Sequence, residues 1–159
     1  MKNLIPVLFF LLIISCSLFD NEADDFEASK EKWEAQKAEG YEFRYGLSCF
    51  CPQVTPAIIV VDADTIYQVL DPAGRDSLMI QTGENTFRYA GDIYKESYKT
   101  VDELFEIIRE ARGADELDVE YNSESGFPMS INIDYEKNTA DDEVLYTVSN
   151  YIPYRFTTQ

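Results

Sequence analysis

Apolar and polar residues alternate along much of the chain with the period of two that is typical of β-strands. The alternation is clearest over residues 41–45 and 117–121, where every second side chain is apolar or aromatic. Further strands are predicted at 56–62, 65–71, 127–135 and 143–152, with shorter ones at 78–80 and 87–89. Residues 56–62 are apolar on both faces, which favours a central place in a sheet.

Two segments follow a helical pattern instead. Residues 26–39 lack Pro and Gly, and their apolar stripe is thin, so we expect burial of Trp33 to hold this helix in place. The second helix begins after Thr100, which forms a predicted capping box with Glu103. Its apolar stripe consists of Val101, Leu104, Phe105, Ile108 and Ala111.

The order of these elements predicts an α+β fold. We expect two helix-strand-strand-strand units that form one antiparallel sheet packed against two helices. The pattern P-x-x-I-x-x-D occurs at Pro56 and again at Pro128, each time after a strand that contains tyrosine. This recurrence, together with the matching order of elements, favours an internal repeat.

The first residues resemble a bacterial lipoprotein signal. Lys2 is followed by an apolar run of about 11 residues, too short for a ~30 Å bilayer core, which ends at Ser15 and Cys16. We predict removal of residues 1–15, lipidation of Cys16, an acidic tether over 16–25 and a single domain over 26–159. The lipid on Cys16 would anchor the protein to a membrane. Ser17 resembles the default signal for sorting to the outer membrane of the cell envelope. The domain would then lie on the periplasmic side or the surface side of that membrane.

Charge and composition narrow the function classes. The formal net charge of −17 makes nucleic acid an unfavourable partner. The chain contains no histidine, which removes His-based triads and the commonest zinc ligand, and none of the common nucleotide or hydrolase motifs is present. No cofactor and no enzymatic activity are expected.

Two cysteines stand one residue apart, at Cys49 and Cys51, on either side of Phe50. Strand parity predicts that both point to the same inward face as Tyr45. Three interpretations stay open: a structural or idle disulfide, a buried reduced pair and a reactive redox couple. A ring this small is strained and therefore reducible, but no basic residue stands close in sequence to lower a thiol pKa.

Grouped carboxylates form the other candidate for chemistry. Asp62 and Asp64 flank one turn, and Asp141, Asp142 and Glu143 precede the last strand. Such groups suit Ca²⁺ or acid–base chemistry, but neither cluster has the regular spacing of a calcium loop. Turn chemistry explains the first cluster and a solvated loop the second, so we predict no metal site.

Several landmarks along the chain together resemble a family of small bacterial secreted proteins and lipoproteins that is known only as a domain of unknown function. They are an early-helix Trp33; Tyr41, Phe43 and Tyr45; Cys49, Cys51 and Pro52; Thr100 to Phe105; Tyr121, Asn122, Gly126, Phe127 and Pro128; and Asp141, Asp142 and Glu143. The resemblance spans most of the mature chain and implies the domain boundaries but no activity. We expect structural roles for Trp33, Tyr41, Phe43, Tyr45, Thr100, Phe105, Tyr121, Gly126 and Pro128.

The sequence therefore predicts a lipid-anchored envelope lipoprotein that acts as a non-enzymatic binding module for an unknown protein or polymer. Two alternatives remain open. One is a thiol-redox lipoprotein that uses Cys49 and Cys51, and the other is a calcium-binding protein that uses the grouped carboxylates.

Overall fold

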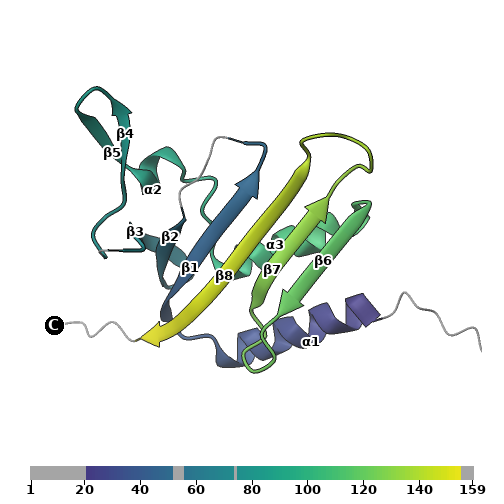
Figure 1. The fold of residues 1–159 in the computed structure, drawn as a ribbon. Helices are drawn as coiled ribbons and strands as arrows, with labels where there is room; N and C mark the ends of the chain where they lie inside the picture. The colour runs from purple at the N-terminus through teal and green to yellow at the C-terminus, as the bar shows by residue number, and fades with distance from the viewer. Residues whose placement is uncertain (1–20, 52–55, 74, 155–159) are drawn as a thin grey trace, which may run out of the picture.

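A six-stranded antiparallel sheet forms the centre of the computed structural model, which describes residues 21–51, 56–73 and 75–154 (Figure 1). Neighbouring strands follow the order β3-β2-β1-β8-β7-β6. Their bounds are Gly40–Cys49 (β1), Ala57–Asp62 (β2), Thr65–Leu70 (β3), Glu116–Tyr121 (β6), Pro128–Asp134 (β7) and Glu143–Tyr154 (β8). The helices are α1 (Asn21–Gln36), α2 (Ala90–Ile93) and α3 (Val101–Glu110), and a 3-10 turn over Ala111–Gly113 follows α3.

The predicted α+β class is confirmed, and each predicted strand overlaps an observed one. The prediction of a single sheet and two helices is incomplete, because β4 (Met79–Gly83) and β5 (Thr86–Tyr89) form a second, two-stranded sheet and α2 is a third helix. In Figure 1 this hairpin projects away from the main sheet. Its short strands are largely exposed and pair only with each other within the described residues, so the sequence pattern alone did not separate them from the main sheet.

One face of the main sheet is covered by α1 and α3, which both lie behind the sheet in Figure 1. Strand alternation sends Tyr41, Phe43 and Tyr45 of β1 to this face, where each is fully buried. They join Ile59 and Val61 of β2, Ile131 and Ile133 of β7, and Leu104, Phe105 and Ile108 of α3 in one core. The predicted structural role of the β1 aromatics follows from this packing.

The early helix is longer than predicted. It begins at Asn21 and not at Phe26, so residues 21–25, which were expected to belong to a tether, are helical. Acidic residues near a helix start interact favourably with the helix dipole, which is why the same residues suit both a tether and a first turn. The signal segment, Cys16 and Pro52 lie outside the described residues.

Trp33 fixes α1 against the rest of the domain. Its side chain is fully buried, its ring meets Tyr41 and Tyr151 edge-on at 5.4 Å, and its Nε1 donates a hydrogen bond to Oδ1 of Asp102 at 3.0 Å. Lys37 reaches the same carboxylate at 3.3 Å. Burial alone would lower the pKa of Lys37, but the neighbouring carboxylates, led by Asp102, raise it overall. The expectation that Trp33 docks the helix is confirmed.

Helix α3 begins with the predicted capping box. Thr100 Oγ1 accepts a hydrogen bond from the amide of Glu103 at 3.2 Å, and Glu103 Oε2 accepts one from the amide of Thr100 at 2.7 Å. Phe105 faces inward from this helix, edge-on to Phe26 of α1 at 5.8 Å and stacked on Tyr121 of β6 at 6.1 Å. These contacts place both helices on the same face of the sheet.

The loop between β6 and β7 packs on α1. Asn122 organises it, because its Oδ1 accepts hydrogen bonds from the amides of Glu124 and Ser125. Gly126 lies in this loop with φ of +79°. Pro128, which is buried, begins β7 opposite Tyr121. The structural roles predicted for this turn are therefore accounted for by local hydrogen bonding and by contact with the helix.

Candidate functional site

The outer face of the main sheet, opposite the helices, carries most of the exposed polar side chains of the strands. Strand β6 presents Glu116, Asp118 and Glu120 on this face, and β8 presents Thr147 and Ser149. An apolar cluster of Ile58, Val60 and Leu70, with the partly buried Tyr154 against it, interrupts this polar surface beside the β3–β4 loop. Next to this cluster, the pairing of β1 with β8 is irregular between Glu42 and Arg44, which pair with Val60 and Ile58 on β2.

That irregularity is a β-bulge in β8. Glu42 pairs with Ile152 and Arg44 pairs with Ser149, so Phe43 alone on β1 stands opposite both Asn150 and Tyr151. Asn150 has φ of +55°, a conformation in which Asn is among the better tolerated side chains. The extra residue lets Val148 and Tyr151 both face the core although they are three positions apart. It also brings the Asn150 side chain to the outer face.

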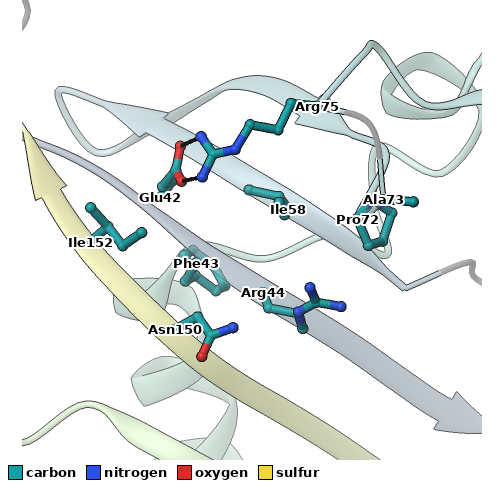
Figure 2. Close-up of a pocket in the computed structure, with 9 residues that line it drawn as sticks. All are labelled: Glu42, Phe43, Arg44, Ile58, Pro72, Ala73, Arg75, Asn150 and Ile152. Atoms are coloured by element: carbon teal, nitrogen blue, oxygen red, sulfur yellow. Dashed lines mark hydrogen bonds and ion pairs between the residues drawn. The ribbon is translucent and has the colours of Figure 1, made fainter.

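A depression of about 370 Å³ lies beside this bulge. Figure 2 shows its lining, in which β1, β2 and β8 supply one side and the β3–β4 loop supplies the other. The lining residues are Glu42, Phe43, Arg44, Ile58, Pro72, Ala73, Arg75, Asn150 and Ile152. The volume falls in the range of roughly 300–1,000 Å³ that is common for ligand pockets.

A paired ion bridge closes one wall of the depression. Both terminal guanidinium nitrogens of Arg75 donate hydrogen bonds to the Glu42 carboxylate, Nη2 to Oε1 at 2.7 Å and Nη1 to Oε2 at 3.2 Å. The bidentate pair ties the β3–β4 loop to β1 and lies beside Ile58 in Figure 2. Burial and the nearby carboxylates of Glu42 and Asp62 raise the pKa of Tyr154 to about 12, so this phenol stays neutral at physiological pH.

Arg44 differs from Arg75 because its guanidinium forms no ion pair with any other residue in the described part of the chain. It is exposed and extends along the outer face near Asn150 (Figure 2). Ile58 lies opposite Arg44 in the pairing of β1 with β2, and Ile152, which is 46% exposed, belongs to the same lining. The depression therefore combines one available cation, one amide and apolar walls.

Charge sets this depression apart from two larger ones, of about 550 and 670 Å³, at the opposite edges of the main sheet. The depression beside β3 has three carboxylates and one ammonium in its lining, and the one beside β6 has four carboxylates and one guanidinium. The depression at the bulge has two guanidiniums and one carboxylate. In a chain of net charge −17, this is a local reversal of sign.

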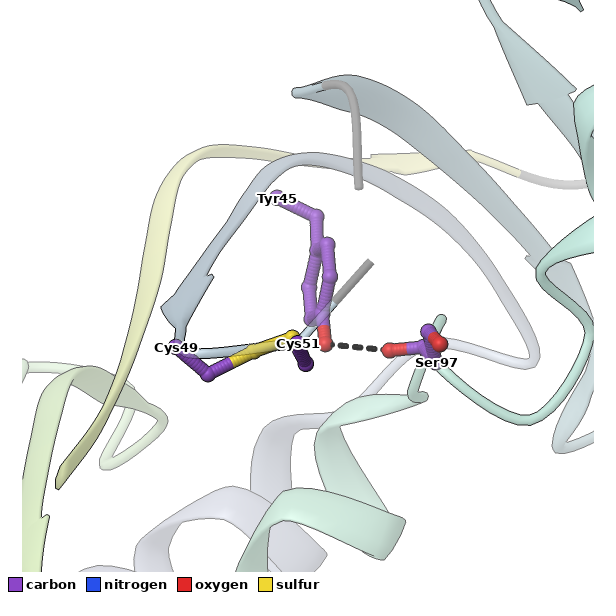
Figure 3. Close-up of a disulfide and its surroundings, with 4 residues drawn as sticks. All are labelled: Tyr45, Cys49, Cys51 and Ser97. Atoms are coloured by element: carbon purple, nitrogen blue, oxygen red, sulfur yellow. Dashed lines mark hydrogen bonds between the residues drawn. A yellow bond between two sulfur atoms is a disulfide. The ribbon is translucent and has the colours of Figure 1, made fainter. Parts of the chain in front are cut away.

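Cys49 and Cys51 form a disulfide at the end of β1, with Cα atoms 5.2 Å apart (Figure 3). This pairing supports the two interpretations that contain a disulfide over a buried reduced pair. The inward parity expected for both cysteines is wrong for Cys51, which is exposed because β1 ends at Cys49. Tyr45, four residues before Cys49, faces the core, and its hydroxyl donates a hydrogen bond to the Ser97 carbonyl oxygen at 2.6 Å.

The grouped carboxylates lie in two turns. Asp62 ends β2 and Asp64 stands in the two-residue turn to β3, where its carboxylate pairs with Lys37 at 3.5 Å. Asp141, Asp142 and Glu143 lead into β8. Among residues 21–51, 56–73 and 75–154, no group of three Asp, Glu or Cys side chains is arranged to hold a metal ion.

Arg44, Arg75 and Asn150 were not predicted as site residues from the sequence. A signal for the bulge was present, because Val144, Tyr146 and Val148 alternate and Tyr151 then breaks the parity. Asn150, which lies between Val148 and Tyr151, is a residue type that tolerates positive φ. The approach of Arg75 to Glu42, 33 residues away in sequence, had no local signal.

These features define a small α+β domain with one face covered by helices and the other open, with a positively charged depression on the open face. The chain belongs to a family of unknown function (DUF6174), whose model matches residues 25–153. No curated protein and no solved structure matches the chain. Of the helices in the described ranges, none has the length and hydrophobicity to span a membrane.

Proposed function

We propose that the protein is a lipid-anchored, non-enzymatic binding module of the bacterial envelope that binds its partner on the outer face of the sheet. The depression at Arg44 is the observation that carries this proposal. The anchor rests on Ser15 and Cys16 after a short apolar segment. The anchor and the open face suit a domain that is tethered to the outer membrane and meets a partner beside it.

The anchor is tested by the mass and partitioning of the mature protein. We expect the purified membrane form to begin at Cys16 and to carry fatty acid, and Cys16→Ala to move the protein into the aqueous phase of a detergent partition. A wild-type protein that retains residues 1–15, or that partitions into water, would contradict the anchor without bearing on the depression.

The chemistry of the depression favours a carboxylate with an aliphatic group beside it. The Glu42–Arg75 pair is neutral as a whole, so Arg44 leaves the site with one net positive charge, which matches a single carboxylate. Ile58, Ile152 and Pro72, in the same lining, offer apolar contact to a group attached to that carboxylate. A peptide that ends in an aliphatic residue supplies both groups, and we propose a protein partner of this kind.

Binding of N-acetyl-leucine to the full mature chain, followed by ¹⁵N chemical shifts, tests this ligand class. We expect the amides of Arg44 and Asn150 to shift, and N-acetyl-leucinamide, which lacks the carboxylate, to bind at least about tenfold more weakly. Arg44→Gln is expected to weaken binding by a similar factor, because a hydrogen bond to a charged group contributes about 1.5–3 kcal/mol.

Arg88→Gln is the matched control. Arg88 is exposed on β5, in the hairpin that projects away from the main sheet in Figure 1, and its replacement removes the same charge. We expect binding within about twofold of the wild type, which separates local recognition from the overall charge of the chain. Equal losses in both variants, or equal binding of the acid and the amide, would contradict the site. If the protein bound glucuronic acid more tightly than N-acetyl-leucine, the ligand class would be an acidic sugar and not a peptide.

We also propose that the two predicted helix-strand-strand-strand units are related by an internal repeat. It is supported by the order α1-β1-β2-β3 and α3-β6-β7-β8, with the strands of each unit adjacent in the sheet. An experimental structure in which the two units failed to superpose over a helix and three strands would contradict the repeat.

A further inference from the structure

The Cys49–Cys51 disulfide contributes little as a structural link. It joins residues two positions apart, and in the chain-entropy model the stabilisation by a disulfide grows with the length of the loop that it closes. The end of β1 is already held by pairing, because Cys49 lies opposite Val144 of β8 and Ser48 lies opposite Leu145. The disulfide therefore adds little to the stability of the fold, and its chemistry is the more informative property.

The two cysteines differ in exposure. Cys49 is half-buried at the end of its strand, whereas Cys51 lies beyond the strand and is exposed. An incoming thiolate therefore meets Cys51 first, and Cys49 is the sulfur that leaves. In thiol–disulfide exchange, access decides which of two sulfurs is attacked.

Phe50 stands between the two cysteines and is 79% exposed. Among the large hydrophobic side chains of the described residues, no other is exposed to this degree. An exposed aromatic side chain next to an accessible disulfide offers an apolar contact to a protein that approaches the sulfur.

We propose that Cys49 and Cys51 form a thiol–disulfide exchange site that accepts two electrons from a dithiol protein of the thioredoxin class. The site lies at the end of β1, apart from the depression at Arg44, and does not depend on the function proposed for that depression. It extends one of the interpretations that the cysteine spacing left open.

The exchange proceeds in two balanced steps. A donor thiolate attacks Sγ of Cys51, a mixed disulfide forms, and the Cys49–Cys51 bond breaks with Cys49 leaving as a thiolate that takes a proton from water. The second donor thiolate then attacks the donor sulfur of the mixed disulfide and releases Cys51, which is protonated in turn. The donor is oxidised to its disulfide and the chain is reduced by two electrons; the same steps in reverse pass the electrons to a disulfide of a second protein.

Single-cysteine variants of the mature chain test which sulfur is attacked. Both variants also carry Cys16→Ala, so that Cys49→Ser leaves only Cys51 and Cys51→Ser leaves only Cys49. With 5,5′-dithiobis(2-nitrobenzoate) under native conditions, we expect Cys49→Ser to react at least about tenfold faster than Cys51→Ser, because its remaining thiol is the exposed one. In about 6 M guanidinium chloride, which unfolds most domains, both thiols are exposed and the two rates should converge.

The protein donor is tested with a thioredoxin that lacks its resolving cysteine. We expect it to form a mixed disulfide with the wild-type chain, which mass spectrometry maps to Cys51. Phe50→Ser should slow reduction by intact thioredoxin at least fivefold while leaving reduction by dithiothreitol within twofold. A purely structural role for Phe50 would change both rates or neither.

Three results would overturn the proposal. They are a disulfide that stays intact with excess reduced thioredoxin until the domain unfolds, a mixed disulfide that maps to Cys49, and equal rates for the two single-cysteine variants in the native state. Binding of N-acetyl-leucine at Arg44 is expected to continue in all of these variants, so failure here leaves the depression untouched.

Discussion

Trp33→Ala is expected to lower the free energy of unfolding by about 3–5 kcal/mol, the usual cost of removing a large buried aromatic side chain. The ring is fully buried, and it contacts Tyr41 and Tyr151 at 5.4 Å and Phe127 at 6.5 Å. The substitution also removes the hydrogen bond from Nε1 to Asp102. The apolar stripe of α1 is thin, and Phe26 is the other large apolar side chain that it buries among its described residues.

Urea denaturation followed by far-UV circular dichroism measures this loss, since Trp33 is the only tryptophan and its fluorescence disappears with it. Trp33→Phe keeps part of the ring volume but loses the hydrogen bond, and we expect a smaller cost of about 1–3 kcal/mol. Phe87→Ala is the control, because Phe87 is 57% exposed on the β4–β5 hairpin and should change stability by no more than about 0.5 kcal/mol. A Trp33→Ala protein as stable as the Phe87→Ala protein would show that α1 is held by other contacts.

Much of the fold was predictable because local pattern and tertiary burial agree. Tyr41, Phe43 and Tyr45 alternate with polar residues, and the sheet buries all three on one face. The capping box at Thr100 depends on residues only three positions apart, so the sequence alone contains all of its information. The start of α1 was missed because acidic residues suit both a solvated tether and the first turn of a helix.

The depression was beyond the reach of sequence patterns for a different reason. Arg44 is one polar residue in an alternating strand, and nothing local distinguishes it from Glu42 two positions earlier. Their different roles arise when the β3–β4 loop folds over β2 and Arg75 pairs with Glu42, which leaves Arg44 without a partner among the described residues. The cysteine pair was visible as a motif, but the exposure of Cys51 depends on where β1 ends, and strand ends are poorly fixed by alternation.

The second large effect is expected at Gly126, where alanine should cost about 2–5 kcal/mol from positive φ together with overpacking. The residue has φ of +79°, and an added Cβ would lie 2.1 Å from the Ser29 carbonyl oxygen and 3.0 Å from the Trp33 nitrogen. Both of those atoms belong to the backbone of α1, so no side-chain rotation relieves the contact. The β6–β7 loop would have to move away from the helix.

Gly113→Ala is the matched control, because an added Cβ there meets nothing within 4 Å. We expect its stability to stay within about 1 kcal/mol of the wild type, since the substitution mainly restricts the unfolded chain. Trp33 fluorescence, retained in both variants, reports directly on the docking of α1, and Gly126→Ala should shift its emission towards the solvent-exposed value before the rest of the domain unfolds. If the two alanine variants unfold at the same urea concentration with the same emission, the loop does not need glycine at this position, and the close packing of Gly126 on α1 does not hold the helix to the sheet.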